Sequence, residues 1–461
     1  MAGEWPTVRL VDHVESCLGK MLDKEKNRGK FFPYLGNKNV RWGSFDTENL
    51  AQMRFEEHEH ERYGLKYGDL IVCEGGEPGR CAIWKDEIPG MKIQKALHRI
   101  RPREGLDNIY LHYWFLWSGR NGSLEPFFTG TTIKHLTGKA IAELDIPLPS
   151  LSEQKTIAHI LGTLDDKIEL NRQMNATLEA MAQALFKSWF VDFDPVIDNA
   201  LAAGHPIPEP LHTRAEAHKA LGDKRKPLPE AIQKQFPSRF VFNEEMGWVP
   251  EGWGVSQLGG AIDLATGPAF KSKEFTKQGI RLARGDNVKE GKFQWGDKTR
   301  YWPEITEGLE RYKLIAGDVL IGMDGSKVGK NWVRVGASDL PCLLVQRVAR
   351  LRPIGLVGSS FLEVLIGGAG FKRYVDNVKT GTSIPHISGG QIKSLSILNP
   401  NDGGEIFNEF ERQLLASAQR KEANLGEINT LSKLRDTLLP KLLSGQLRIP
   451  DAEKLAEEAL A

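Results

Sequence analysis

The chain has 461 residues, of which 40% are hydrophobic and 26% charged, and its formal net charge at pH 7 is +1. These fractions are ordinary for a globular protein, and the length predicts two or three domains, each able to bury its own core. The balanced charge gives no basic signature, so a nucleic-acid-binding face would have to be local or completed by a partner. No apolar run is long enough to span a membrane and no signal peptide is recognisable, so we expect a cytoplasmic protein without a membrane partner.

The sequence predicts a first α+β domain over residues 1–150. Short apolar runs at 70–73 and 81–84 are separated by a Gly-rich turn and predict strands. The four cysteines of the chain include no CxxC pair, so we expect reduced thiols and no metal.

A long helix is predicted over residues 151–195. It contains no Pro before Pro195 and only one Gly, and apolar residues recur at alternating steps of four and three, as in a coiled-coil seam. Ser150 and Glu153 fit a capping box at its start, and Asp194-Pro195 fits its end. The seam consists of Ile157, Leu161, Leu164, Ile168, Asn171, Asn175, Leu178, Ala182 and Leu185.

Residues 196–247 are rich in Pro and charge and predict a linker, with one short helix near residues 213–221. A second α+β domain is expected over 248–401 and a second long helix over 402–445, capped by Asp402 and Glu405. Pro440 should kink or end that helix. A polar C-terminal tail is predicted over residues 446–461. The second seam includes Phe410, Leu414, Asn424, Ile428, Leu431 and Leu438.

One segment occurs twice. Residues 129–149 (TGTTIKHLTGKAIAELDIPLP) align without a gap to residues 380–400 (TGTSIPHISGGQIKSLSILNP) at a constant shift of 251, and ten of 21 positions are identical. A repeat half the chain long is no short solenoid repeat and predicts two similar domains, each followed by a helix. Such a molecule suits a target that also comes in two halves.

Two polar seam residues suggest how the helices pair. Asn171 and Asn424 lie near the middle of their helices and differ by 253, close to the repeat shift. In an antiparallel pair equivalent mid-helix residues meet, so we expect Asn171 to pack near Asn424 and to fix the register. The alternative is that both face solvent.

The motifs of several enzyme classes are absent. An amino-methyltransferase needs a Pro-Pro-aromatic loop and the chain has no Pro-Pro dipeptide, while residues 325–331 have the wrong spacing for a phosphate-binding loop. Residues 450–454 compress the carboxylate spacing of a Mg-dependent nuclease too far. His58-Glu59-His60 lacks the i, i+4 histidine pair of a metal helix and fits a solvated charged face better.

The order domain, helix, domain, helix resembles the specificity subunits of type I restriction–modification systems over essentially the whole chain. Three strings carry the resemblance in combination: KSWFVDFDP at residues 187–195, GWVPEGW at 247–253 and RDTLLPKLLSG at 435–445.

This resemblance implies a non-catalytic subunit with two target recognition domains, each reading half of an asymmetric, bipartite site on double-stranded DNA. The two helices would form an antiparallel coiled coil that spaces the domains and docks two methyltransferase subunits. Those partners would carry S-adenosylmethionine, and restriction or translocase subunits would add ATP and Mg, so this chain would bind no cofactor. Two alternatives stay open: a coiled-coil scaffold, and a DNA-modifying enzyme with an unrecognised active site.

With that resemblance, two segments of each domain become candidates for DNA contact. In the repeated loop, glycine permits close approach while hydroxyls and amides can bond phosphates, although a structural turn explains the loop equally well. The Gly-rich turns could reach phosphate or guanine through Arg80, Lys327 and Lys330. Arg99, Arg101, Arg350 and Arg352 alternate on strands and could form a basic face or a solvated one. The candidates are Glu74, Gly75, Gly76, Arg80, Thr129, Gly130, Thr131, Thr132, His135, Asp324, Gly325, Lys327, Lys330, Thr380, Gly381, Thr382, Ser383 and His386.

Overall fold

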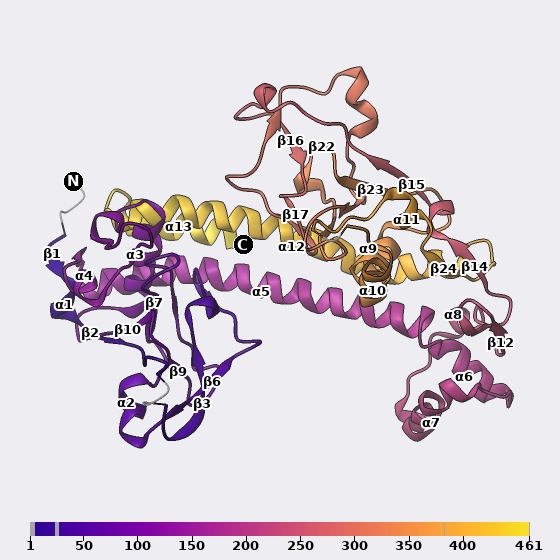
Figure 1. The fold of residues 1–461 in the computed structure, drawn as a ribbon, viewed down its shortest axis with the longest axis horizontal. Coiled ribbons are helices and arrows are strands. Elements are labelled where there is room, and N and C mark those ends of the chain that lie inside the picture. The colour runs from indigo at the N-terminus through magenta and orange to yellow at the C-terminus, as the bar shows by residue number, and fades with distance from the viewer. Residues whose placement is uncertain (1–4, 24–26, 382, 461) are drawn as a thin grey trace. The chain divides into compact units, whose positions relative to one another are not determined.

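The computed structural model describes residues 5–23, 27–381 and 383–460, which divide into two compact units. Unit 1 combines residues 1–170 with residues 427–461, and unit 2 comprises residues 171–426. Two long helices, α5 (Leu151–Phe190) and α12 (Glu405–Leu443), each contribute to both units (Figure 1). Among the described residues, no helix has the length and apolar character that a membrane crossing requires.

Three of the sheets of unit 1 have counterparts in unit 2. The largest has the order β2-β10-β7-β8, formed antiparallel by Val14–Leu18, Leu97–Pro102, Leu70–Cys73 and Cys81–Ile83. A second sheet places β3 (Lys30–Leu35) between the antiparallel β6 (Ala51–Phe55) and the parallel β9 (Lys92–Ile93). The third pairs β1 (Thr7–Arg9) with β11 (Asp145–Pro147). Strands β7 and β8 confirm the two strands expected from the apolar runs.

Unit 2 repeats this topology. Its four-stranded sheet has the order β15-β23-β20-β21, formed antiparallel by Ile262–Thr266, Val348–Pro353, Val319–Gly322 and Trp332–Arg334. Strand β16 (Ile280–Ala283) lies between the antiparallel β19 (Tyr301–Trp302) and the parallel β22 (Cys342–Leu344). β14 (Gly254–Gln257) pairs with β24 (Ser396–Asn399). The internal sequence repeat is thus accompanied by a repeat of strand order and of pairing direction.

Short helices cover the sheets. In unit 1 they are α1 (Leu10–His13), α2 (His60–Tyr63), α3 (Asn108–Arg120) and α4 (Gly138–Ala142), and α3 buries Tyr110 and Phe115 in the main core. In unit 2 they are α9 (Ser359–Gly367), α10 (Ala369–Val378) and α11 (Gly389–Lys393).

The long helices share the core of each unit. In unit 1, Leu161 of α5 and Leu438 of α12 belong to one buried cluster. In unit 2, the ring of Phe190 stacks on that of Phe407, with centroids 5.6 Å apart. The predicted seam residues Ile157, Leu161, Leu164, Ile168, Asn171, Asn175, Phe410, Leu414, Asn424, Leu431 and Leu438 are buried, while Leu178, Leu185 and Ile428 are partly buried.

The helix starts follow the predicted caps. The Ser150 N–H donates to Glu153 Oε2 at 2.9 Å and the Glu153 N–H donates to Ser150 Oγ at 3.3 Å, which completes the capping box. Asp402 accepts hydrogen bonds from two backbone N–H groups at the start of α12. Pro440 lies inside α12 and does not end it, since the helix continues to Leu443.

The segment 196–247, for which the sequence predicts a linker, is folded rather than extended. The segment holds α6 (Asp194–Ala203), α7 (His212–Leu221), α8 (Glu230–Gln233), β12 (Phe240–Asn243) and β13 (Gly247–Pro250). Its charges pair with one another: buried His218 lies between Asp194 (Nε2–Oδ1, 3.0 Å) and Asp198 (Nδ1–Oδ1, 2.9 Å), and Arg214 and Arg225 donate to the same two carboxylates. These ion pairs stabilise a segment whose composition alone predicts an extended chain. The expected short helix near 213–221 is confirmed as α7.

The predicted polar tail is likewise ordered. Residues from Ile449 to Leu460 form α13, and Ala452 and Ala456 are buried against the core of unit 1. The two alanines are four residues apart, so they share one helix face despite the charged residues between them.

Candidate nucleic-acid interface

In unit 1, the Gly-rich turn that follows β7 and the repeated loop at 129–135 lie side by side. Gly75 forms an antiparallel bridge with His135, and His135 also bridges Thr129 across the loop. The Leu136 N–H donates to the Glu74 carbonyl at 2.7 Å. The two segments singled out in the sequence, which lie some 60 residues apart, thus form one surface.

Unit 2 builds the same surface from the equivalent residues. Asp324 bridges His386, which bridges Thr380, and the Ile387 N–H donates to the Met323 carbonyl at 3.0 Å. Gly325 additionally donates its N–H to the Pro385 carbonyl at 3.0 Å. We call residues 129–135 and 380–386 the shared loops.

The shared loops require glycine at one position. Gly130 and Gly381 have φ of +91° and +85°, and a Cβ there would lie 2.3 Å and 2.4 Å from the carbonyl oxygens of Ile133 and Ile384. The backbone therefore folds back on itself in the same way in both units. Thr129, Gly130, Thr131, Thr132, Thr380, Gly381 and Ser383 are exposed, His135 and His386 are half-buried, and Thr382 lies outside the described residues.

Each shared loop also exposes an isoleucine that our sequence reasoning missed. Ile133 is 62% exposed and Ile384 is 63% exposed, at equivalent positions of the repeat. Their identity in both copies was the available signal. An exposed apolar side chain beside exposed hydroxyls suits a surface that contacts both sugars and bases.

The charged side chains of the Gly-rich turn of unit 1 pair with neighbouring groups of the same unit. Arg80 Nη1 donates to Glu77 at 2.9 Å, and its Nη2 donates to the Asn37 carbonyl at 2.9 Å. The candidate Arg80 therefore holds the turn, because its guanidinium is largely enclosed. The carboxylate of Glu74 lies 3.9 Å from Nε2 of His98, whose pKa is lowered by burial. Gly75 is buried, whereas Gly76 is exposed with φ +76°.

The turn of unit 2 carries charges that stay accessible. Lys327 and Lys330 are exposed. Asp324 accepts a short hydrogen bond from Nδ1 of His386, and its other oxygen lies 3.2 Å from Nε of Arg347. Asp324, Lys327 and Arg347 border a cleft of about 590 Å³.

The four strand arginines do not form a basic face. Arg101 donates two hydrogen bonds to buried Asp69 at 2.7 and 2.8 Å, and Arg352 does the same to Asp318 at the same distances. Arg99 is 2% exposed and pairs with Glu15 at 2.6 Å; Arg350, 4% exposed, pairs with Asp263. Their charges are neutralised within each sheet, so they hold strands together.

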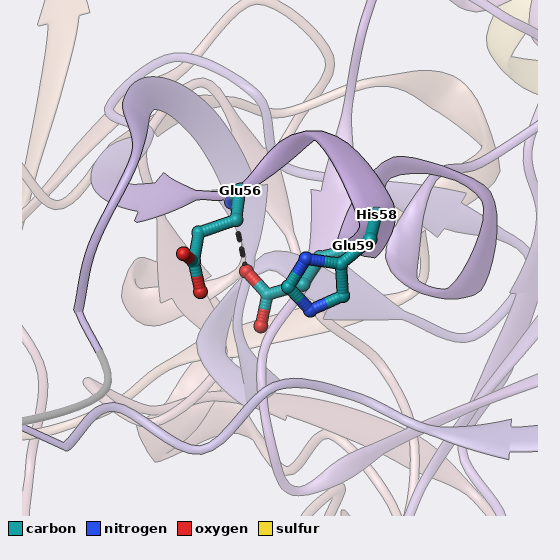
Figure 2. A group of neighbouring side chains, drawn as sticks. All are labelled: Glu56, His58 and Glu59. Carbon is teal, nitrogen blue, oxygen red and sulfur yellow. Dashed lines mark hydrogen bonds between the residues drawn. The ribbon is translucent and has the colours of Figure 1, made fainter.

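One acidic group could in principle hold a metal, but its charges are already used. Glu56, His58 and Glu59 lie together at the turn before α2 (Figure 2). Glu59 accepts the N–H of Glu56 at 2.9 Å and lies 2.5 Å from the ammonium of Lys20. Burial acts to raise the pKa of Glu59, but the hydrogen bonds from Lys20 and from the backbone lower it below its usual value. The ammonium would repel a cation, so the group is better explained as a capped turn.

The four cysteines are free thiols, as expected. Cys73, Cys81 and Cys342 are buried, and burial raises the pKa of Cys73 to about 11. Such thiols are poor nucleophiles at neutral pH.

Comparison with known proteins gives a consistent result. The family model of the type I restriction modification DNA specificity domain matches residues 2–180. The type I restriction enzyme MjaIX specificity subunit of Methanocaldococcus jannaschii is 25% identical over 83% of this chain and 78% of its own length. The type I restriction enzyme HindI specificity subunit of Haemophilus influenzae is 28% identical over 83% of this chain and 87% of its own length.

A solved structure shares the fold. The S subunit of a type I restriction–modification system from M. genitalium covers 95% of this chain and 96% of its own, with a TM-score of 0.52 and 16% sequence identity. At that identity the likeness concerns the fold alone.

Proposed function

Since the chain belongs to the specificity subunits of type I restriction–modification systems, we propose that each unit carries one target recognition domain, over residues 1–150 and 248–401, and that the two together read an asymmetric, bipartite site on double-stranded DNA. The chain is a specificity subunit and not an enzyme. DNA recognition is its role in the family.

The observation that carries the proposal is the repeated pairing of a shared loop with a Gly-rich turn. The loop backbone is nearly the same in both units, down to the left-handed glycine and the exposed isoleucine. A contact present in both copies should bind what every DNA site has, namely phosphate and sugar. The turns differ between the units, so the sequence-specific contacts should lie there, and the two half-sites should differ.

The second part of the proposal is that α5 and α12 form an antiparallel coiled coil that spaces the domains. In unit 1 Asp165 pairs with Arg435 at 2.5 Å. In unit 2 Asn175 accepts from Asn424 at 2.8 Å, and Glu179 pairs with Lys421 at 2.6 Å. Within each unit the contacts fit helices that run in opposite directions.

These helices would also dock two methyltransferase subunits. Large apolar side chains on their unit 2 segments are exposed, among them Met181 at 58% and Leu415 at 55%. Exposed apolar side chains on helices are favourable contacts for a protein partner. The partners would supply S-adenosylmethionine, and a restriction subunit would supply ATP and Mg chemistry, so this chain needs no cofactor of its own.

Because many cations of the chain are paired internally, we expect the isolated chain to bind DNA weakly and with strong salt dependence. Tight binding should require the methyltransferase partner. Nanomolar specific binding by the chain alone at physiological salt would contradict this.

The deciding experiment is co-expression with the partner methyltransferase, followed by single-molecule sequencing of host DNA for N6-methyladenine. We expect a split, asymmetric motif, one half of which changes when residues 1–150 are exchanged for those of a relative and the other half when residues 248–401 are exchanged. An intact complex that methylates nothing would favour a scaffold, and methylation without a partner would mean that the chain is an enzyme.

A further inference from the structure

The two units differ at one structurally matched pair of positions. Ala96 and Arg347 each directly precede an equivalent strand, and each has a left-handed backbone, with φ of +89° and +67°. Their carbonyls accept equivalent hydrogen bonds, from the Glu74 N–H at 2.8 Å and from the Met323 N–H at 3.0 Å. The backbone is therefore the same in both units, and what differs is a methyl group in one and a guanidinium in the other.

The position that faces them differs in the same way. Gly75 and Asp324 occupy equivalent places, since each bridges the histidine of its shared loop. Unit 1 thus combines Gly75, Ala96 and His135, whereas unit 2 combines Asp324, Arg347 and His386. The same backbone arrangement therefore carries no ionic side chain at these two positions in unit 1, whereas in unit 2 it carries the ion pair of Asp324 and Arg347.

We propose that Arg347, oriented by Asp324, reads a guanine in the half-site bound by unit 2, and that unit 1 has no such contact. The proposal rests on the function proposed above. Arg347 is new to the candidate set, because it lies outside the Gly-rich turn in sequence and only the fold brings it to Asp324.

The geometry of Arg347 suits a base rather than a phosphate. Its Nε makes the ion pair with Asp324 at 3.2 Å, and its side chain is 68% exposed, so the terminal nitrogens can present two parallel donors. Guanine offers the matching pair of acceptors, O6 and N7, in the major groove. The carboxylate of Asp324 would repel a negatively charged phosphate. A guanine base is neutral and is not repelled, so toward a base the carboxylate acts only by fixing the direction of the guanidinium.

The surroundings support a recognition site. The two carboxylate oxygens of Asp324 contact Arg347 and His386, one each, so the orientation of this side chain is fixed by two partners. Asp324 and Arg347 border the cleft of about 590 Å³, which is also lined by Arg284, Lys327 and Gln346. A cleft of this size with convergent polar groups is typical of a site that receives part of a ligand.

The test uses the complex with its methyltransferase partner and three variants, Arg347→Ala, Asp324→Asn and, as a control, Lys372→Ala on α10. We expect Arg347→Ala to relax one guanine position of one half-site in the methylated motif while the other half-site stays unchanged. Asp324→Asn should weaken the same preference less. Lys372→Ala should leave the motif as it is. An unchanged motif with Arg347→Ala would overturn the inference.

Binding measurements with the same complexes cover the case in which Arg347→Ala abolishes methylation. Duplexes that carry 7-deazaguanine lack the N7 acceptor, so they should bind the wild-type complex about 10- to 100-fold more weakly than guanine duplexes do. The Arg347→Ala complex should bind both duplexes alike. Equal weakening in both complexes, or a loss that is the same for every base, would indicate a phosphate or structural role and overturn the inference. If the wild-type complex gives no split motif at all, the proposed function itself fails.

Discussion

The side-chain amide of Asn424 donates to Oδ1 of Asn175 at 2.8 Å, and both residues are buried between α12 and α5. The sequence pointed to Asn171 as the residue that meets Asn424, but the bonded partner lies one helical turn further along. The separation of 253 residues between Asn171 and Asn424, close to the repeat shift of 251, could define the meeting point only to within a turn, because side-chain packing rather than repeat equivalence sets the register. Asn171 is itself buried and is not without an interaction partner.

The first prediction concerns this amide pair. Asn424→Leu should lower the free energy of unfolding by about 1–3 kcal/mol, because Asn175 is left buried without its donor. The double variant Asn175→Leu/Asn424→Leu should recover much of that loss, since no polar group is stranded. Denaturant titration measures both. Gln419→Leu, exposed on the same helix, provides the control, and an equal loss in the control would contradict a specific role for the pair.

The second prediction concerns the pair of Asp69 and Arg101. Arg101→Ala should lower the free energy of unfolding by about 3 kcal/mol, because the carboxylate of Asp69 stays buried without its counter-ion. The pKa of Arg101 is raised by its hydrogen bond with Asp69, in keeping with a tightly held charge. Arg41→Ala removes the exposed ion pair with Asp46 and should cost less than about 1 kcal/mol. If Arg101→Ala instead left stability intact and reduced the salt slope of DNA binding, the arginine would be a phosphate contact after all.

The third prediction concerns His112 on α3. Burial lowers its pKa to about 4, so the folded protein holds the neutral imidazole beside Sγ of Cys81. The unfolded chain binds the proton near pH 6.5, so stability should be complete above that pH and fall as the pH drops toward 4. The full effect is on the order of 3 kcal/mol.

Comparing His112→Phe with the wild type isolates this contribution. The variant should lose less stability between pH 6.5 and pH 4 than the wild type does, as followed by thermal unfolding at a series of pH values. The same change at exposed His58 should leave the wild-type pH dependence in place. Parallel curves for wild type and His112→Phe would contradict the assignment.

Features set by neighbouring residues were predictable from the sequence. The start of α5 depends on hydrogen bonds between Ser150 and Glu153, three residues apart, and the strand Leu70–Cys73 depends on its own apolar run. The pairing of the Gly-rich turns with the shared loops was not predicted, although both segments were candidates. Nothing local shows that residues 75 and 135 form a bridge.

Features set by distant charge pairs could not be predicted. The segment 196–247 is folded because Arg214 and His218 form hydrogen-bonded ion pairs with Asp194, which lies 20 or more residues away. The choice between a basic and a solvated face for Arg101 could not be made for the same reason, since its partner Asp69 lies 32 residues before it. A charged residue indicates little by itself until its partner is known, and that partner is defined by the fold.

The last prediction concerns the glycines of the shared loops. Gly130→Ala and Gly381→Ala each place a Cβ against a carbonyl oxygen at a left-handed backbone position, so the loop must open. Because the loops are exposed and the strands behind them are held separately, we expect only a small change in unfolding temperature. DNA binding by the complex should fall by about 10-fold or more, from the loss of roughly one or two hydrogen bonds to charged phosphate oxygens.

The effect should be independent of the bound sequence, because the loop is common to both units. Binding to specific and to random duplexes should therefore weaken by the same factor in each glycine variant. Gly162→Ala is the matched control, since that glycine lies inside α5, away from its ends, with open space around its Cβ position. The change should leave DNA binding intact while stabilising the helix by up to about 1 kcal/mol. If binding were lost only for one specific sequence, the shared loops would contact the bases, and the Gly-rich turns would only hold those loops in position.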